Sequence, residues 1–207
     1  EETESDFLCF SHPDAVVIVC AAAYLERGLN LALQTMEITE NAVLCVNMMD
    51  EAKKRGIHID LEKLKTKLGI PVIGTSAKRG IGINELMDAA VSQFNHSGIY
   101  KIRYLSAVEE AIGILQPVIE KEISGINPRY ASVSLLEDSD AFFAKILIHQ
   151  NKDFSNNISV ANALKKARQI LSAADINKET LSDIISSCSV LAAEDICNGC
   201  IVCENGK

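Results

Sequence analysis

The hydrophobic positions in the first half of the chain alternate between short continuous runs and helical spacing. Strand-like runs occupy 15–20, 41–46 and 71–74, and the first of them is rich in β-branched residues. Runs of this length suit strands that are covered on both faces. Between them, Leu25, Leu29, Leu33 and Met36 recur at helical intervals. The remaining helices of this half are expected over 61–68 and 83–94. The pattern predicts an α/β fold, part of a doubly wound parallel sheet.

The second half of the chain loses the strand pattern after Gly98 and keeps only helical spacing. Clusters of Asn, Asp, Gly and Pro separate the apolar segments, as expected of turns between helices. The predicted helices span 104–123, 128–136, 141–148, 158–173 and 178 to about 197. We therefore expect two domains, an α/β domain over 1–96 and an all-α helical bundle over 97–207.

Charge and composition restrict the classes of partner. The 207 residues are 48% hydrophobic, which is ordinary for a globular protein, and carry a formal charge of -8. An acidic surface repels a phosphate backbone, so we expect no nucleic acid partner. No stretch approaches the roughly 20 apolar residues of a membrane span. The sequence starts at Glu1 with an acidic segment that has no initiating Met and no signal-peptide pattern, so we expect it to be a piece of a longer protein.

A polar quartet, Asn47-Met48-Met49-Asp50, directly follows the second predicted strand. The carboxyl ends of parallel strands are where such sheets bind ligands. A carboxylate at Asp50 selects a base edge with two adjacent donors, which guanine has and adenine lacks. Asn47 offers a donor and an acceptor to the base or to neighbouring loops, and Met48 a polarizable side chain to cover a ring. The alternative is a helix N-cap in which Asp50 helps to start a helix.

A second polar segment, Thr75 to Gly80, follows the next strand and is therefore expected at the same edge of the sheet. Its central Ser76-Ala77-Lys78 completes the candidate site. We expect Ser76 to brace Asp50 and the backbone N–H of Ala77 to reach the guanine carbonyl oxygen. The alternative is a polar loop that caps the helix starting near Ile83.

These motifs, taken together, resemble a known family. The segments Leu25-Glu26-Arg27, Asn47-Met48-Met49-Asp50-Glu51-Ala52, Gly69-Ile70-Pro71-Val72 and Ser76-Ala77-Lys78-Arg79-Gly80-Ile81-Gly82 resemble the cytosolic G domain of bacterial ferrous iron transport protein B. Asn127-Pro128-Arg129-Tyr130 and Leu135-Leu136-Glu137 resemble the helical domain that joins this G domain to a membrane permease.

The resemblance implies a function for the parent protein. It implies binding of GTP or GDP, slow GTP hydrolysis, and coupling of the nucleotide state to ferrous iron movement through the protein's own transmembrane permease. The location implied is the cytoplasmic face of the bacterial inner membrane. Residues 1–96 would be the C-terminal part of the G domain, and 97–207 the helical domain.

The phosphate-binding elements of such a domain are missing from the sequence. It contains no G-x-x-x-x-G-K-[ST] loop, no switch Thr and no Asp-x-x-Gly, which supply the phosphate and Mg²⁺ contacts of phosphoryl transfer. We therefore expect Mg²⁺ only in a complete domain, and no hydrolysis by this chain alone. Another hypothesis is a nucleotide-free interaction module that docks a partner or a membrane domain.

Three cysteines near the end of the sequence, Cys197, Cys200 and Cys203, recur every three residues. Thiolates at this spacing can chelate zinc or an iron-sulfur centre, which makes a metal-sensing tail a third hypothesis. A structural site usually needs four ligands, and the tail has no His. The competing interpretation is a fraying helix end with incidental cysteines.

Overall fold

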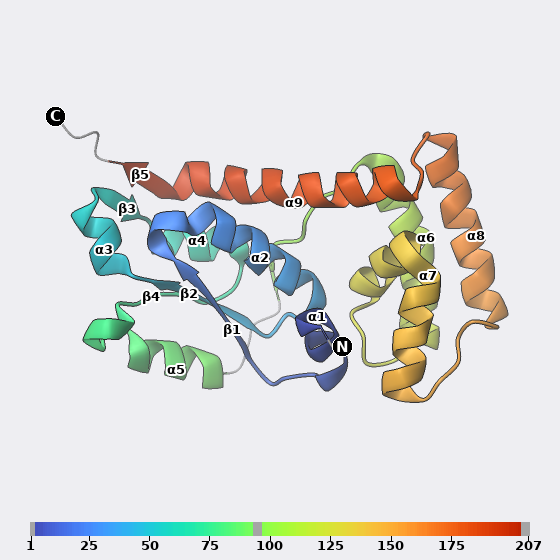
Figure 1. Cartoon of the computed structure of the whole chain (residues 1–207), viewed down its shortest axis with the longest axis horizontal. Helices are drawn as coiled ribbons and strands as arrows, with labels where there is room; N and C mark the ends of the chain where they lie inside the picture. The colour runs from blue at the N-terminus through green and yellow to red at the C-terminus, as the bar shows by residue number, and fades with distance from the viewer. Residues whose placement is uncertain (1–2, 93–96, 204–207) are drawn as a thin grey trace. The chain divides into compact units, whose positions relative to one another are not determined.

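The computed structural model describes residues 3–92 and 97–203, and the side chain of Cys203 is outside the description as well. The chain divides into two compact units, one formed by Glu1–His12 with Arg103–Cys188 and the other by Pro13–Ile102 with Ser189–Lys207. We refer to the first as the helical unit and to the second as the sheet unit. Figure 1 labels the elements of both.

The sheet unit is built on three parallel strands. They are β1 (Val16–Ala21), β2 (Ala42–Asn47) and β4 (Val72–Gly74), in the order β1-β2-β4. Val16 lies opposite Ala42, and Leu44 lies opposite Val72. All three strands lie where the hydrophobic runs predicted them, and the predicted α/β fold class is confirmed.

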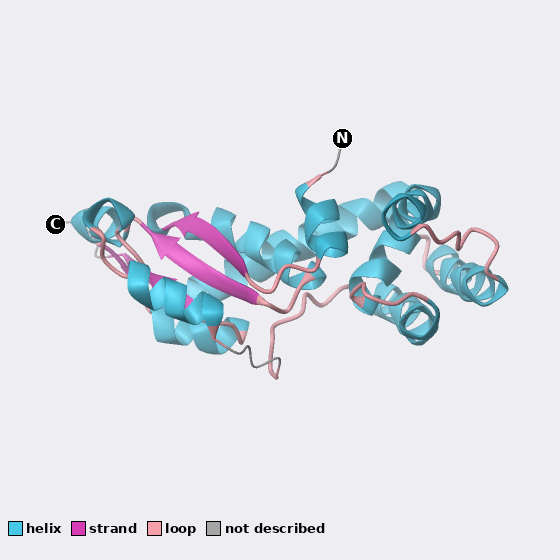
Figure 2. Ribbon diagram, turned by 90° about the horizontal axis from the view of Figure 1, so that it is seen from below, coloured by secondary structure: helices cyan, strands magenta, loops and turns pink. Residues whose placement is uncertain are grey.

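Helices lie on both sides of this sheet, but Val17 and Val19 of the edge strand β1 are exposed, so this strand is not covered on both faces as expected. In Figures 1 and 2, α2 (Leu25–Ile38) and α4 (Leu61–Leu68) lie on one side of the strands and α5 (Ile83–Val91) on the other. The central strand β2 is buried from residue 42 to residue 46, which explains its continuous apolar run. The helix α5 ends at Val91, whereas the sequence predicted a helix over 83–94. Residues 93 and 94 of that predicted range lie outside the described residues.

A second, antiparallel pair of strands was not predicted. It joins β3 (Ile57–Ile59), which follows the short helix α3 (Met49–Lys54), to β5 (Ile201–Cys203). The strand β5 directly follows α9 (Lys178–Cys200), and the N–H of Asp60 donates to the Cys200 carbonyl at 2.9 Å. The interpretation of the tail as a fraying helix end is therefore wrong for residues 201–203.

The helical unit contains α1 (Glu4–Ser11), α6 (Ser106–Glu122), α7 (Pro128–Gln150), α8 (Ile158–Ala173) and the first part of α9. Two separate helices were predicted within α7. The structure joins them across a kink at Asp138, where φ is -152° and ψ is 89°. Among the described residues, no helix has the length and hydropathy that a membrane crossing requires.

The N-terminal helix α1 packs within the helical unit. Asp6 forms an ion pair with Lys145 of α7 at 2.7 Å, and the Phe10 ring stacks on His149 with 4.3 Å between centroids. The predicted domains, 1–96 and 97–207, are continuous in sequence, whereas each compact unit also takes one terminal segment. These α1 contacts and the β3–β5 pairing are the physical reason for the difference.

Arg129 contacts two residues near the start of α6, Tyr104 and Glu109. Arg129, in the first turn of α7, donates to both carboxylate oxygens of Glu109 at 2.9 and 2.7 Å. The same carboxylate accepts the Tyr104 N–H at 2.8 Å, and the Arg129 guanidinium lies 5.2 Å from the Tyr104 ring centroid. The hydrogen bonds from Arg129 lower the pKa of Glu109 below its usual value.

Candidate nucleotide-base site

Two loops meet at one edge of the sheet because they follow neighbouring parallel strands. Asn47 is the last residue of β2, and Thr75 directly follows β4. The N–H of Thr75 donates to the Val46 carbonyl at 2.8 Å, and the N–H of Met49 donates to the Thr75 carbonyl at 3.1 Å. The backbone alone therefore holds the two predicted motifs side by side.

The side chain of Asn47 ties the loops together. Its Oδ1 accepts hydrogen bonds from Thr75 Oγ1 at 3.0 Å and from the Ala77 N–H at 3.1 Å. The N–H of Ala77, which was expected to reach a guanine carbonyl, is thus engaged within the protein. The next backbone N–H, that of Lys78, has no hydrogen bond within the described part of the chain and lies in the first turn of the 3-10 helix η2 (Ala77–Arg79).

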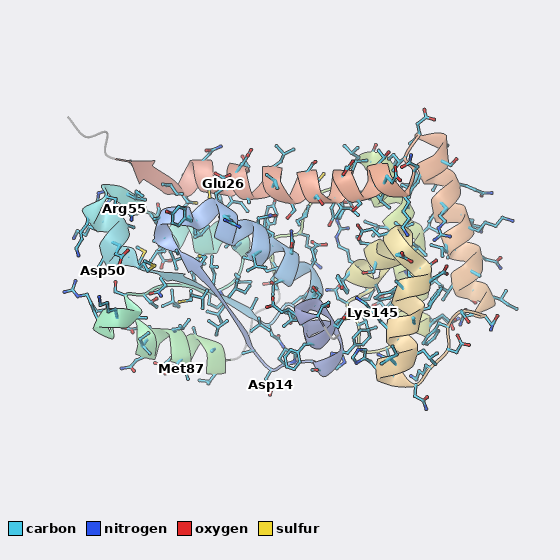
Figure 3. The ribbon with its side chains drawn as sticks, in the orientation of Figure 1. Asp14, Glu26, Asp50, Arg55, Met87 and Lys145 are labelled. Carbon is cyan, nitrogen blue, oxygen red and sulfur yellow. The ribbon has the colours of Figure 1, made fainter. Side chains whose placement is uncertain are left out.

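Asp50 is held from its backbone side by Ser76. The Asp50 N–H donates to Ser76 Oγ at 3.2 Å, and Ser76 is only 5% exposed. A hydrogen bond from Ser76 is the main cause that lowers the pKa of the Asp50 carboxyl, assisted by the charges of Lys54 and Arg79. The carboxylate is therefore ionised at neutral pH and only accepts hydrogen bonds. Figure 3 shows Asp50 on α3, beside the loop that leads to α5.

The capping alternatives are observed only in part: Asp50 lies in the first turn of α3 but is not its N-cap, and the loop before α5 supplies no side-chain cap. The N-cap residue of α3 is Met48, and that of α5 is Gly82; neither has a side-chain cap hydrogen bond. Met48 adopts a left-handed backbone conformation with φ of 63° and is 40% exposed. Such a conformation is uncommon for a residue with a side chain and is often found where a loop serves a function.

Thr75 is a site residue to which the sequence interpretation gave no role. It is 1% exposed, and its hydroxyl lies 3.3 Å from Cys45 Sγ in addition to its bond to Asn47. Its position directly after a strand, beside the polar motif, was the available signal. The loop is closed by paired backbone bonds between Ser76 and Ile81 at 3.0 and 3.3 Å.

The cysteine tail supports the metal hypothesis poorly. Cys197 is 5% exposed and Cys200 is 1% exposed. Burial raises the pKa of Cys197 to about 12 and also raises that of Cys200, which disfavours the thiolates a metal needs. The described side chains include no group of three His, Cys, Asp or Glu placed to hold a metal. The Cys203 side chain lies outside the description, so the three-thiol site stays a prediction.

Comparison with known families assigns both parts of the chain. A family model described as ferrous iron transport protein B matches residues 1–90, and one described as the FeoB cytosolic helical domain matches residues 104–202. The chain belongs to the ferrous iron transport protein B (FeoB) family. The resemblance drawn from the motifs is confirmed.

Curated relatives in this family are much longer than the chain. The Fe(2+) transport protein A/Fe(2+) transporter FeoB fusion protein of Porphyromonas gingivalis is 36% identical over 136 residues, which cover 61% of this chain and 16% of the relative. The Fe(2+) transporter FeoB of Salmonella typhimurium is 28% identical over 138 residues, covering 66% of this chain and 18% of the relative. The matched part is thus less than a fifth of either relative.

Solved FeoB structures share the fold. A mutant of S. thermophilus NFeoB bound to GDP aligns with a TM-score of 0.76 and 21% identity, covering 95% of this chain and 72% of that one. The cytosolic domain of the T. maritima FeoB iron transporter in its GMPPNP form aligns with a TM-score of 0.68 and 24% identity, covering 95% and 71%. At these identities the likeness establishes the fold alone.

Proposed function

We propose that the loops after β2 and β4 bind the guanine base of GTP or GDP, as part of the cytosolic region of a ferrous iron transporter. The observation that carries this proposal is the placement of Asp50, whose backbone N–H donates to Ser76 Oγ and whose carboxyl has a pKa lowered chiefly by a hydrogen bond from Ser76. The GDP and GMPPNP forms of the structural neighbours support it.

Each polar group of the site has a partner on guanine. The two oxygens of Asp50 accept from N1–H and from the exocyclic amine. Because Oδ1 of Asn47 is used within the loop, its NH₂ group is the part offered to N7. The N–H of Lys78 donates to the guanine carbonyl oxygen in place of Ala77. Met48 covers one face of the ring.

The phosphate chemistry is proposed for the whole protein only. Slow GTP hydrolysis, Mg²⁺ binding and coupling to iron movement through a permease at the cytoplasmic face of the bacterial inner membrane are expected there. The sequence contains no G-x-x-x-x-G-K-[ST] loop, so this chain alone is proposed to be inactive in hydrolysis.

A titration with three nucleoside monophosphates tests base recognition on the chain as it is. We expect GMP to shift the amide NMR signals of the two loops at millimolar concentrations, since phosphate contacts are missing. IMP lacks the exocyclic amine and is expected to bind more weakly, and AMP should leave the loops unchanged.

A pair of neighbouring variants sharpens this titration. Asp50→Ala should abolish the GMP response, whereas Glu51→Gln, on the next residue of α3, should retain it. Equal responses to GMP and AMP, or a GMP response that survives Asp50→Ala, would refute the proposal. The alternative of a nucleotide-free interaction module predicts no shift with any of the three nucleotides.

A further inference from the structure

A groove of about 500 Å³ lies within the helical unit, along α7, α8 and the loop that joins them. Figure 1 shows these two helices connected at one end by that loop. The lining residues are Phe143, Phe154, Ser155, Ala161, Leu164, Lys165, Arg168, Gln169 and Ser172. None of them belongs to the proposed base site.

The floor of the groove is apolar and runs along a single stripe of α8. Phe143 of α7, Phe154 of the connecting loop and Leu164 of α8 supply the large apolar surfaces. The α8 residues of the groove extend from Ala161 to Ser172, a length of roughly 16 Å at 1.5 Å per residue. This length fits about three turns of a helix laid in the groove.

The charge of the groove is opposite to that of the chain. Its lining contains Lys165 and Arg168 and no Asp or Glu, although the chain carries a net charge of -8. Arg168 donates to the hydroxyl of Ser139 at 3.0 Å, and this side chain also borders a second hollow that is lined by Glu137, Asp138 and Asp140. Among the described residues, neither Lys165 nor Arg168 forms an ion pair. Lys145 of α7, labelled in Figure 3, does not line the groove and is paired with Asp6.

We propose that this groove binds an acidic, amphipathic helical segment of a partner protein. Apolar side chains of the segment pack against the aromatic floor, and its carboxylates meet the two cations on the rim. A second copy of the chain is a poorer occupant because both molecules carry -8. A membrane surface is a poorer one because the apolar side chains line a concave groove.

The test uses two synthetic helical peptides of about 14 residues on the whole chain. One carries Leu and Phe at i, i+3, i+4 and i+7 with Glu on the flanks, and the other has Lys in place of every Glu. Binding is measured by fluorescence anisotropy and located by NMR shifts. Vesicles of phosphatidylglycerol and sedimentation of the chain alone test the other occupants.

Neighbouring lysines of α8 provide a matched pair of variants. Lys165→Glu lies in the groove, whereas Lys166→Glu makes the same charge change at an exposed residue outside it. We expect the acidic peptide to shift signals of Phe143, Phe154 and Arg168. Lys165→Glu should weaken the affinity for the acidic peptide about 5- to 10-fold, and Lys166→Glu by less than about 2-fold, because one rim charge contributes modestly. Phe154→Ser should weaken it as well.

Four results would overturn the proposal. They are equal binding of the acidic and basic peptides, equal loss in the two lysine variants, absence of shifts at the groove with millimolar peptide, and shifts at the groove caused only by vesicles or by self-association.

Discussion

Replacing Thr75 with Val tests how the two loops are held together. The substitution keeps the shape of the side chain and removes a hydroxyl that is 1% exposed and bonded to Asn47 Oδ1 at 3.0 Å. A buried hydrogen bond contributes about 0.5–1.5 kcal/mol net, and the contact with Cys45 Sγ adds little because sulfur is a weak partner. We expect the free energy of unfolding of the sheet unit to fall by about 1 kcal/mol.

Two measurements check this expectation. Thermal unfolding should show a midpoint lower by about 4–8 °C for a unit of this size. Amide exchange at Ala77 should quicken, because its N–H donates to the Asn47 oxygen that Thr75 orients. The control is Thr35→Val, which removes a 3.0 Å bond to the Leu31 carbonyl within α2. This local bond contributes little, so the control should be close to neutral. The reasoning is refuted if Thr75→Val changes neither the unfolding midpoint nor the exchange at Ala77.

Two further predictions concern the loop backbone and the helical unit. Gly82→Ala should destabilise the sheet unit clearly more than Gly80→Ala. Both glycines have a positive φ, but only at Gly82 would an added Cβ overlap a backbone oxygen of β4. Equal unfolding midpoints of the two variants would contradict this. The depressed pKa of Glu109 means that the ion pair with Arg129 stabilises the helical unit above pH 4.5, and that this stability is lost as the pH falls further. Burial raises the pKa of Glu137, so its contribution has the opposite sign and stability declines as the pH rises through the raised value. Urea unfolding between pH 3 and 7 measures the free energy of unfolding. We expect this free energy to fall less steeply with acidification in Glu109→Gln, and to be higher at neutral pH in Glu137→Gln than in the unchanged chain. The reverse pattern would refute both assignments.

The sheet could be predicted from sequence because its strands are defined by local apolar runs. The run from Ala42 to Val46 is buried on both faces and has no polar position, so its length and composition alone separate it from a helix. The convergence of the two loops followed from the same logic, since polar residues that end neighbouring parallel strands lie at one edge of the sheet. The contact between Asp50 and Ser76, which are 26 residues apart, follows from this convergence of the two loops.

The features that were missed depend on contacts between distant parts of the chain. Three residues from Ile57 to Ile59 are too few to give a strand pattern, and they become a strand only by pairing with Ile201–Cys203. The helix α1 carries an acidic, weakly apolar sequence; Asp6 and Phe10 find their partners on α7. The exact donors of the site were missed for a related reason. Whether the Ala77 N–H points to a ligand or to Asn47 depends on side-chain geometry that the residue types do not specify.

The most direct test of the base-reading claim is a change of base preference by Asp50→Asn. This substitution replaces one carboxylate oxygen with an NH₂ group, so the residue now pairs with one donor and one acceptor. Xanthine presents that combination, because it has a carbonyl oxygen where guanine has the exocyclic amine. The NMR titration of the chain with GMP and XMP measures both affinities. We predict that the Asp50→Asn variant binds GMP at least about 10-fold more weakly than the unchanged chain does. We also predict that it binds XMP about as strongly as the unchanged chain binds GMP. Retention of GMP binding with no gain for XMP would contradict the assignment of Asp50 as the residue that reads guanine.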